Sequence, residues 1–145
     1  MEWMLLPFKR YADFEGRSRR MEYWMYQVFT MLVYVVLIMI MMAGLPWSQM
    51  GETSPNYDPQ AAPGPVFWIG LGLTVLWYLV TFIPDIAVTV RRFHDQDQSG
   101  WMYLIRFFPY LGSLVVMVFM FIDGQRHENR FGSDPKGEGD VNVFR

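Results

Sequence analysis

The sequence predicts an all-α integral membrane protein with three transmembrane helices and an interfacial N-terminal segment, in a single membrane domain over residues 1–145. The main observation is the distribution of charge: residues 23–51, 59–84 and 107–122 contain no Asp, Glu, Lys or Arg. A helix needs about 20 largely apolar residues to cross the ~30 Å hydrocarbon core of a bilayer. Uncharged runs on this scale exclude a soluble enzyme, a DNA-binding module and a secreted scaffold.

The N-terminal segment, residues 1–22, is predicted to lie at the membrane surface. Its aromatic residues include Trp3, Phe8 and Tyr11, and two adjacent basic residues interrupt them. Aromatic rings favour the headgroup level of a bilayer, while basic side chains reach toward water. We therefore expect this segment to lie on the membrane with its aromatic rings inserted.

The first span is expected at residues 24–45, with Tyr23 just before it and Trp47 just past its end. Aromatic rings in these places anchor a helix at both membrane interfaces. Residues 46–65 follow and hold five of the nine prolines of the chain. They are predicted to form an irregular, solvated loop on the outside of the membrane.

The second and third spans are expected at residues 66–90 and 101–122, joined by a short hydrophilic hairpin at 91–100. Pro109 and Gly112 fall inside the third span, and both residue types are tolerated in membrane helices. They also leave an alternative open, in which the third segment enters the membrane, breaks at these two residues and returns to the same side.

The distribution of Lys and Arg predicts the orientation, because cytoplasmic segments carry an excess of these residues. Residues 1–22 carry five and the hairpin carries two, whereas the loop at 46–65 carries none. We therefore expect the N-terminus and the hairpin in the cytoplasm. The polar tail, residues 123–145, carries four more cations. Three full spans place this tail outside, whereas a re-entrant third segment leaves it in the cytoplasm.

Asp85 and Arg106 are predicted to form a charge pair inside the membrane. Each lies about five residues inside the cytoplasmic end of its span, hence roughly 8 Å deep. Neighbouring antiparallel helices bring the two charges to the same depth, and ionisable groups inside a span usually pair or face a cavity. A structural salt bridge is the favoured interpretation. The alternatives are an Arg106 side chain that reaches the headgroups and a proton or ion pathway.

The hairpin concentrates polar and charged side chains, namely Arg91, Arg92, His94, Asp95, Asp97 and Ser99, and Gly100 and Trp101 follow them. They are interpreted as a tight turn, with the arginines on anionic headgroups, carboxylates paired with them, and the tryptophan as an anchor. One histidine with two aspartates gives too few ligands for a metal site, and the serine lacks a base with an orienting group. No metal, cofactor or enzymatic activity is therefore predicted.

A second basic cluster, Arg17, Arg19 and Arg20, directly precedes the first span. Each Lys or Arg beside an anionic leaflet contributes about 1 kcal/mol of attraction. The cluster is interpreted as a determinant of topology, with specific binding of lipid headgroups as the alternative.

Three motifs in order, FEGRSRRMEYW, VRRFHDQDQSGW and ENRFGSDP, resemble the YhaH-like bacterial inner membrane proteins, which form domain-of-unknown-function family 805. The resemblance covers residues 11–136. The family pattern falls on Phe14, Gly16, Arg17, Arg19, Arg20, Glu22, Tyr23, Trp24, Arg91, Arg92, His94, Asp95, Ser99, Gly100, Trp101, Gly124, Asn129, Arg130, Phe131, Gly132, Asp134 and Pro135. The outside loop departs from the pattern, since it is longer and richer in proline than in compact members.

The resemblance implies a multi-pass protein of the bacterial inner (plasma) membrane and no reaction. We expect a structural or interaction component whose cytoplasmic Arg/His/Asp face binds lipid headgroups, anionic phospholipids among them, or a partner. Two interpretations of this face stay open: its Arg, Glu and Asp residues interlock as a network that holds the helix ends together, or the same surface binds lipid headgroups, an anionic metabolite or a partner protein. With the tail in the cytoplasm, a composite site of His94, Asp95, Asn129 and Arg130 becomes a hypothesis to test. The alternative function is a small transporter or channel subunit that uses the charge pair inside the membrane.

Two further expectations concern partners. Three helices bury little surface, so we expect a homo-oligomer that packs through small residues such as Gly70 and Gly72. The net charge is −2 and cysteine is absent, so neither nucleic-acid binding nor disulfide or thiolate chemistry is expected.

Overall fold

The computed structural model describes residues 2–49, 55, 57–58 and 60–137. Parts of the proline-rich loop and of the tail, residues 50–54, 56, 59 and 138–145, lie outside the described residues. The chain divides into two compact units, one of residues 1–29 with 82–145 and the other of residues 30–81, and each is described by itself. The described residues form four α-helices and two 3-10 helices, and they contain no β-strand.

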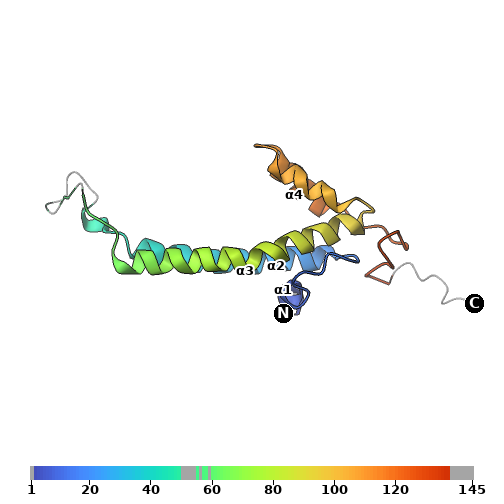
Figure 1. Ribbon diagram of the computed structural model, residues 1–145, viewed down its shortest axis with the longest axis horizontal. Coiled ribbons are helices and arrows are strands. Elements are labelled where there is room, and N and C mark those ends of the chain that lie inside the picture. Colours follow the sequence, from blue (N-terminus) through green and yellow to red (C-terminus); the bar gives the residue numbers. More distant parts are fainter. Residues whose placement is uncertain (1, 50–54, 56, 59, 138–145) are drawn as a thin grey trace, which may run out of the picture. The chain divides into compact units, whose positions relative to one another are not determined.

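The unit of residues 30–81 is a helical hairpin. Its two arms belong to α2 (Arg20–Ala43) and α3 (Pro65–Asp95), which lie side by side (Figure 1). The arms approach closely where Gly70 faces Met41, because a Cβ on this glycine would lie 2.8 Å from Met41 Cγ. Gly70 is therefore used for packing within the chain rather than between chains.

The turn of this hairpin begins with the 3-10 helix η1 (Trp47–Gln49). Gly64 N donates a hydrogen bond of 2.9 Å to the carbonyl oxygen of Gly44, which closes the turn at its base. A side chain on Gly44 would collide with the backbone nitrogen of Phe67, 2.1 Å from an ideal Cβ. The lack of a side chain at this position thus permits the return of the chain.

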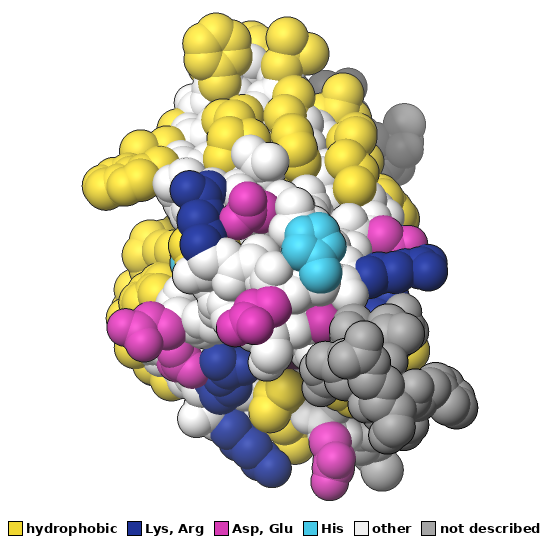
Figure 2. Space-filling view, turned by 90° about the vertical axis from the view of Figure 1, so that its right-hand side faces the viewer, with side chains coloured by type: hydrophobic (Ala, Val, Ile, Leu, Met, Phe, Trp, Pro, Cys, Tyr) yellow, Lys and Arg dark blue, Asp and Glu magenta, His cyan; other side chains and the backbone are white. Residues whose placement is uncertain are grey.

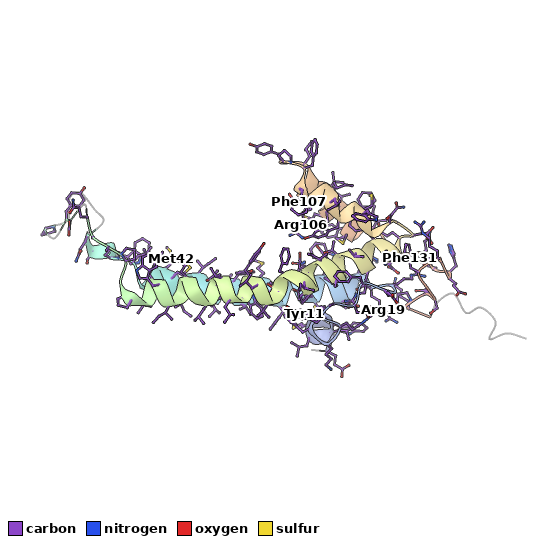
Figure 3. All side chains as sticks on the ribbon, in the orientation of Figure 1. Tyr11, Arg19, Met42, Arg106, Phe107 and Phe131 are labelled. Carbon is purple, nitrogen blue, oxygen red and sulfur yellow. The ribbon has the colours of Figure 1, made fainter. Side chains whose placement is uncertain are left out.

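In the unit of residues 30–81, most apolar side chains of α2 and α3 point outward rather than into a core (Figure 3). The most apolar stretches of the two helices have mean hydropathies of 2.2 and 2.1, yet only 11% of either stretch is buried. A soluble protein seldom exposes a large contiguous apolar surface, whereas bilayer lipid covers it in a membrane protein. Both helices are long and apolar enough to cross a membrane.

The unit of residues 1–29 and 82–145 has a small hydrophobic core, formed by Tyr23, Tyr26, Val88, Phe93, Val116 and Met120. The N-terminal segment adds the helix α1 (Glu2–Lys9), whose Phe8 ring lies 5.5 Å from the ring of Tyr26 and 6.1 Å from that of Phe29. Phe8 therefore packs on protein instead of inserting into lipid. Trp3 and Tyr11 stay 38% exposed and Phe14 stays 41% exposed, so these rings are available to an interface.

The expected helix over residues 101–122 is not continuous. The 3-10 helix η2 (Gly100–Phe107) and the helix α4 (Gly112–Phe121) take its place and pack against each other. The turn between them includes Tyr110 with φ of 65°, a backbone conformation that bulky residues seldom adopt. Gly112 has no room for a side chain, because its Cβ would lie 1.9 Å from the carbonyl oxygen of Ile105.

This break changes the expected number of spans. Ten residues of α4 reach about 15 Å, which is half of the ~30 Å hydrocarbon core. The described residues thus contain two helices that can cross a membrane and one shorter apolar helix, not three continuous spans. The expected break points Pro109 and Gly112 lie at this turn.

The helix α3 continues through Asp95, beyond the expected end of the second span. The ion pair between Arg92 and Asp95, three residues apart, supports this last helical turn. Only residues 96–99 connect α3 with η2, and among them Asp97 has φ of 57°, which aspartate tolerates better than most residues. The expected hairpin of ten residues is therefore a four-residue connection.

Candidate functional site: a buried ion-pair network

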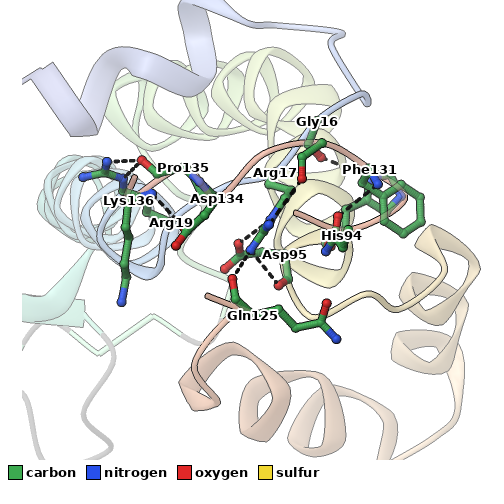
Figure 4. Close-up of polar contacts among 12 residues, drawn as sticks. Gly16, Arg17, Arg19, His94, Asp95, Gln125, Phe131, Asp134, Pro135 and Lys136 are labelled. Atoms are coloured by element: carbon green, nitrogen blue, oxygen red, sulfur yellow. Dashed lines mark hydrogen bonds and ion pairs between the residues drawn. The ribbon is translucent and has the colours of Figure 1, made fainter. Parts of the chain in front are cut away.

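A buried ion-pair network joins motif residues that are far apart in the sequence. Asp95 Oδ1 accepts a hydrogen bond of 2.9 Å from Arg17 Nε, and Asp95 Oδ2 pairs with Arg92 Nη1. The three side chains are 6%, 1% and 0% exposed, respectively. Charges removed from water in this way are stable only when they are paired and hydrogen-bonded. Figure 4 shows Arg17 reaching Asp95 at the centre of the network.

The tail completes the contacts of Arg17. Its Nη1 donates to the carbonyl oxygens of His127 at 2.7 Å and Gly132 at 3.3 Å, and its Nη2 donates to that of Gln125 (Figure 4). A guanidinium group offers five N–H donors in a rigid arrangement, which suits several acceptors at once. One buried side chain from the N-terminal segment thus holds the tail against the end of α3.

A second buried pair joins α3 to the start of α2. Arg91 Nη2 donates to Glu22 Oε1 at 3.0 Å, and these side chains are 0% and 4% exposed. The carbonyl oxygen of Arg91 also accepts from Ser18 N at 3.1 Å. The interpretation of Arg91 and Arg92 as headgroup contacts is therefore wrong, because α3 continues as a helix and turns both side chains toward protein carboxylates.

The network has more positive than negative charge. It contains three guanidinium groups and two carboxylates, those of Arg17, Arg91, Arg92, Glu22 and Asp95. Arg92 Nη2 also donates to the carbonyl oxygen of Ile122. Since buried N–H groups need acceptors, the carbonyl group of Ile122 at the end of α4 and those of the tail are part of the network.

Arg19 and Arg20 lie at the partly exposed edge of the network. Arg19 Nε donates to the carbonyl oxygen of Pro135 at 2.6 Å (Figure 4), and its guanidinium group lies 5.5 Å from the centre of the Trp3 ring. Arg20 Nη2 lies 2.5 Å from Asp123 Oδ1, and these side chains are 42% and 49% exposed. Arg19 and Arg20 are thus the arginines of the first motif that remain accessible to a ligand.

The histidine of the second motif is used in packing. The rings of His94 and Phe131 are stacked, with centroids 3.8 Å apart and an interplanar angle of 5°. His94 Nδ1 lies 3.3 Å from the carbonyl oxygen of Gly16. In the tautomer that carries its hydrogen on Nδ1, this N–H donates to that oxygen. His94 therefore joins the first motif to the third.

The tail residues Asn129 and Arg130 lie beside the same end of α3. Asn129 Nδ2 donates to the carbonyl oxygen of His94 at 2.9 Å. Arg130 Nε lies 3.1 Å from Asp97 Oδ1, in a pair whose side chains are 60% and 39% exposed. The composite group of His94, Asp95, Asn129 and Arg130 is thus assembled in one unit of the chain.

The last three residues of the second motif begin η2. Ser99 is its N-cap, and the hydroxyl oxygen accepts from Trp101 N at 3.4 Å. Gly100 packs tightly, since a Cβ there would lie 2.8 Å from Val90 Cγ1. Trp101 is 79% exposed and remains available to anchor at an interface.

The charge pair expected inside the membrane has a third member. Arg106 Nη1 lies 2.9 Å from Asp85 Oδ2, the contact that matched depth predicts, and Gln27 Nε2 donates to Asp85 Oδ1 at 2.8 Å. The side chains of Arg106 and Asp85 are 42% and 22% exposed. Asp85 therefore ties α2 and η2 to α3.

A surface ion pair orders the chain between α1 and α2. Arg10 Nε donates to Asp13 Oδ2 at 2.8 Å, and Asp13 Oδ1 accepts from Glu15 N at 3.1 Å. The hydrogen bond from Arg10 is the main cause that lowers the pKa of the Asp13 carboxyl group below its usual range. This pair therefore remains ionised at any pH near neutrality.

Sequence reasoning missed several members of the site. A network of the Arg, Glu and Asp residues of the first two motifs is one of the sequence-based interpretations, but the specific pair of Glu22 with Arg91 is not predicted. Gln27 gives a signal only as a polar residue in an uncharged run. The carbonyl groups of the tail belong to the backbone, which every residue has, so no pattern of side chains in the sequence indicates that they take part. In the part of the chain that the structure describes, no three His, Asp or Glu residues are placed to hold a metal ion.

Comparison with known proteins agrees with this description. Residues 11–133 match the family DUF805, described as a protein of unknown function. The inner membrane protein YhaI of Escherichia coli K12 is 35% identical over 136 residues, which cover 94% of this chain and 97% of YhaI. The inner membrane protein YhaH of the same strain is 34% identical over 139 residues, which cover 95% of this chain and 99% of YhaH.

No solved structure matches the chain. Both relatives are named inner membrane proteins, and the outward apolar faces of α2 and α3 fit that location. The resemblance inferred from the three motifs is confirmed by the match over residues 11–133. The chain is therefore an inner membrane protein that belongs to the DUF805 family.

Proposed function

We propose that the protein is a structural or interaction component of the inner membrane, whose Arg/His/Asp face binds lipid headgroups or a partner protein. The face consists of the N-terminal segment, the end of α3 and the tail. Figure 2 shows dark blue, magenta and cyan side chains on the face turned toward the viewer, next to yellow hydrophobic ones. A mixed charged face beside an apolar surface is typical of a protein region at the membrane interface.

The observation that carries this proposal is the burial of Arg17 among tail carbonyl groups and Asp95. Side chains that are almost wholly buried cannot bind a ligand directly. The motif residues Arg17, Arg91, Arg92 and Asp95 therefore build the face, and the more exposed residues around them are left to bind. This supports the interpretation of the network as a structural assembly.

The finer topology is part of the same proposal. The N-terminus, the connection at 96–99 and the tail lie in the cytoplasm, α2 and α3 cross the membrane, and η2 with α4 enters it and returns. The cations support this, because the N-terminal segment and the tail carry nine Lys and Arg residues and the loop at 46–65 carries none. The contacts between Arg17 and the tail give the re-entrant alternative more support than three full spans.

Cysteine labelling tests this topology, since the chain has no cysteine of its own. The variants Gln98→Cys, Ser133→Cys and Tyr57→Cys place single thiols at exposed positions of the connection, the tail and the loop. An impermeant maleimide added to intact spheroplasts is expected to label only Tyr57→Cys. Labelling of Ser133→Cys but not Gln98→Cys would place the tail outside and contradict the proposal.

The alternative function, a small transporter or channel subunit, uses Asp85 and Arg106. It has less support, because Asp85 accepts hydrogen bonds from both Arg106 and Gln27 and is satisfied as a structural contact. If the pair is structural, Asp85→Asn lowers the melting temperature in detergent and Arg106→Gln adds no further loss in the double variant. Loss of a transport phenotype in Asp85→Asn with unchanged stability would favour the alternative.

The proposal assigns no reaction to the chain. His94 is stacked on Phe131, and Ser99 caps η2, so both have structural uses that need no substrate. The variant His94→Ala is expected to leave the cellular phenotype unchanged when its membrane level matches the wild type. A lost phenotype at equal membrane level would favour an embedded enzyme.

A homo-oligomer remains part of the proposal. Gly70 faces Met41 in the same chain, but Gly72 has no atom within 4 Å of an ideal Cβ. A small residue on an exposed helix surface permits a second helix to approach closely. The mass of the detergent-solubilised protein by light scattering tests this, and a monomer at all concentrations would exclude it.

A further inference from the structure

A groove of about 600 Å³ lies in the unit of residues 1–29 and 82–145, between the start of α2 and the end of α4. Its lining combines three cations and three apolar side chains, those of Arg19, Arg20, Lys136, Met21, Trp24 and Phe121. A ligand that fits such a lining needs a negative charge and an adjoining apolar part. A phospholipid at the membrane surface has both.

The cations of the groove outnumber the carboxylates that neutralise them. Asp123 Oδ1 lies 2.5 Å from Arg20 Nη2 and 3.5 Å from Lys136 Nζ, so one carboxylate serves two cations. Arg19 donates to the uncharged carbonyl group of Pro135. The groove therefore keeps an excess of positive charge, and guanidinium and ammonium groups both bind phosphate oxygens strongly.

The apolar wall continues directly from these cations. The rings of Trp24 and Phe121 lie 4.4 Å apart between centroids, and Phe121 and Met21 are 58% and 57% exposed. Tryptophan is enriched at the headgroup level, where its ring contacts acyl chains and its N–H faces the polar side. The side chains that border the cations are thus ones that pack well against lipid.

We infer that this groove binds an anionic glycerophospholipid, whose phosphate group contacts Arg19, Arg20 and Lys136 and whose acyl chain lies along Trp24 and Phe121. The inference deepens the proposed function and rests on it, since it selects lipid headgroups as the ligand and assigns them to one groove. The buried arginines of the network have no direct contact with this lipid. They hold the tail, and thereby Lys136, in place.

The position of Asp123 gives the inference a distinctive consequence. Its carboxylate already occupies the place of an anion between Arg20 and Lys136, and the side chain is 49% exposed. A lipid phosphate must therefore displace this carboxylate or share its cations. Asp123→Asn removes the competing charge and should strengthen binding of the lipid.

Native mass spectrometry of the full chain in detergent can measure this preference. The protein is incubated with phosphatidylglycerol and phosphatidylcholine of the same acyl chains, and the ratio of the two bound lipids is recorded. We expect the wild type to favour phosphatidylglycerol and each of Arg19→Gln and Lys136→Gln to lower the ratio about fivefold, the equivalent of ~1 kcal/mol for each cation. Lys9→Gln is the matched control, because Lys9 is exposed on α1 and does not line the groove.

Asp123→Asn is expected to raise the ratio of bound phosphatidylglycerol to phosphatidylcholine. Because a poorly folded variant would lose binding rather than gain it, this variant separates an effect on the groove from an effect on folding. Equal ratios in the wild type, Lys136→Gln and Lys9→Gln would overturn the inference. Displacement of bound phosphatidylglycerol by an excess of inorganic phosphate would also overturn it, since the site would then belong to a soluble anion.

The measurement in detergent does not depend on membrane sidedness. Failure of the topology shows only in the labelling of Ser133→Cys, and failure of the groove shows only in the lipid ratios. The two results therefore distinguish an error in the proposed function from an error in this inference.

Discussion

Substitution of Asp95 by Asn is the most direct test of the buried network, because it removes one charge and leaves the shape of the side chain almost unchanged. Asp95 pairs with both Arg17 and Arg92, and none of the three side chains is more than 6% exposed. Without the carboxylate, the two guanidinium groups remain buried with no countercharge between them. Breaking a buried ion pair by removing one partner costs about 3–5 kcal/mol.

Thermal unfolding of the full chain in detergent measures this loss. A change of this size should lower the melting temperature by roughly 10 °C for a chain of this length. Because Arg17 then holds the tail less firmly, trypsin should also cleave faster after Arg126 and Arg130.

Asp97→Asn is the matched control for this experiment. It makes the same chemical change two residues away, where the pair with Arg130 is 39% and 60% exposed, and exposed pairs contribute about 0–1 kcal/mol. The positive φ of Asp97 is also one that asparagine tolerates. Equal melting temperatures and equal cleavage rates for Asp95→Asn and Asp97→Asn would refute the reasoning.

Four further substitutions test close packing. Gly124→Ala places a methyl group 1.9 Å from the carboxylate of Asp95. The melting temperature should therefore fall and trypsin should cleave the tail faster. An unchanged melting temperature and cleavage rate would contradict the contact between Gly124 and Asp95. Gly70→Ala places a methyl group 3.0 Å from the backbone nitrogen of Met41 and should lower the free energy of unfolding in an SDS titration by about 1–3 kcal/mol. Gly72→Ala meets no atom within 4 Å and should leave that free energy equal or higher, so equal losses in both variants would contradict the packing. His94→Ala removes a ring stacked on the tail and should cost about 0.5–1.5 kcal/mol; an unchanged cleavage rate would show that the stack adds nothing.

The two long helices could be predicted from the sequence because the hydrocarbon core of a bilayer has a fixed thickness, which sets the minimum length of an apolar helix that crosses it. Uncharged runs of 29 and 26 residues at 23–51 and 59–84 exceed what a span requires. The ends of the helices were less predictable. Arg91 and Arg92 look like the start of a solvated turn, yet α3 continues through both residues, and each side chain pairs with a buried carboxylate.

The third segment shows where hydropathy reasoning fails. The run at 107–122 is uncharged, but Pro109 and Gly112 interrupt it, and the close approach of Gly112 to Ile105 depends on a backbone contact that no pattern of side chains reports. Two features of the sequence indicate the alternative in which the third segment is broken. They are the Pro and Gly inside the run, and the cations of the tail, which disagree with a tail placed outside.

The pairing within the site could not be derived from the sequence. Arg17 and Asp95 are 78 residues apart, and the sequence offers several other arginines and carboxylates of the same chemistry. Motif spacing indicates that the residues belong together but not which atoms meet. The contact between Asp85 and Arg106 could be predicted, because a short connection between antiparallel segments fixes their depth.

The hydrogen bonds from Arg17 to the tail also determine when, during synthesis of the chain, the buried network can form. Arg17 is made early, while Gln125, whose carbonyl group it holds, follows 108 residues later. At about 5–20 residues per second, synthesis of that interval takes roughly 5–20 s. Through this time the buried network has no closing segment. A chain truncated before the tail lacks the carbonyl groups that Arg17 holds, so this face stays open to proteases until the tail has been made.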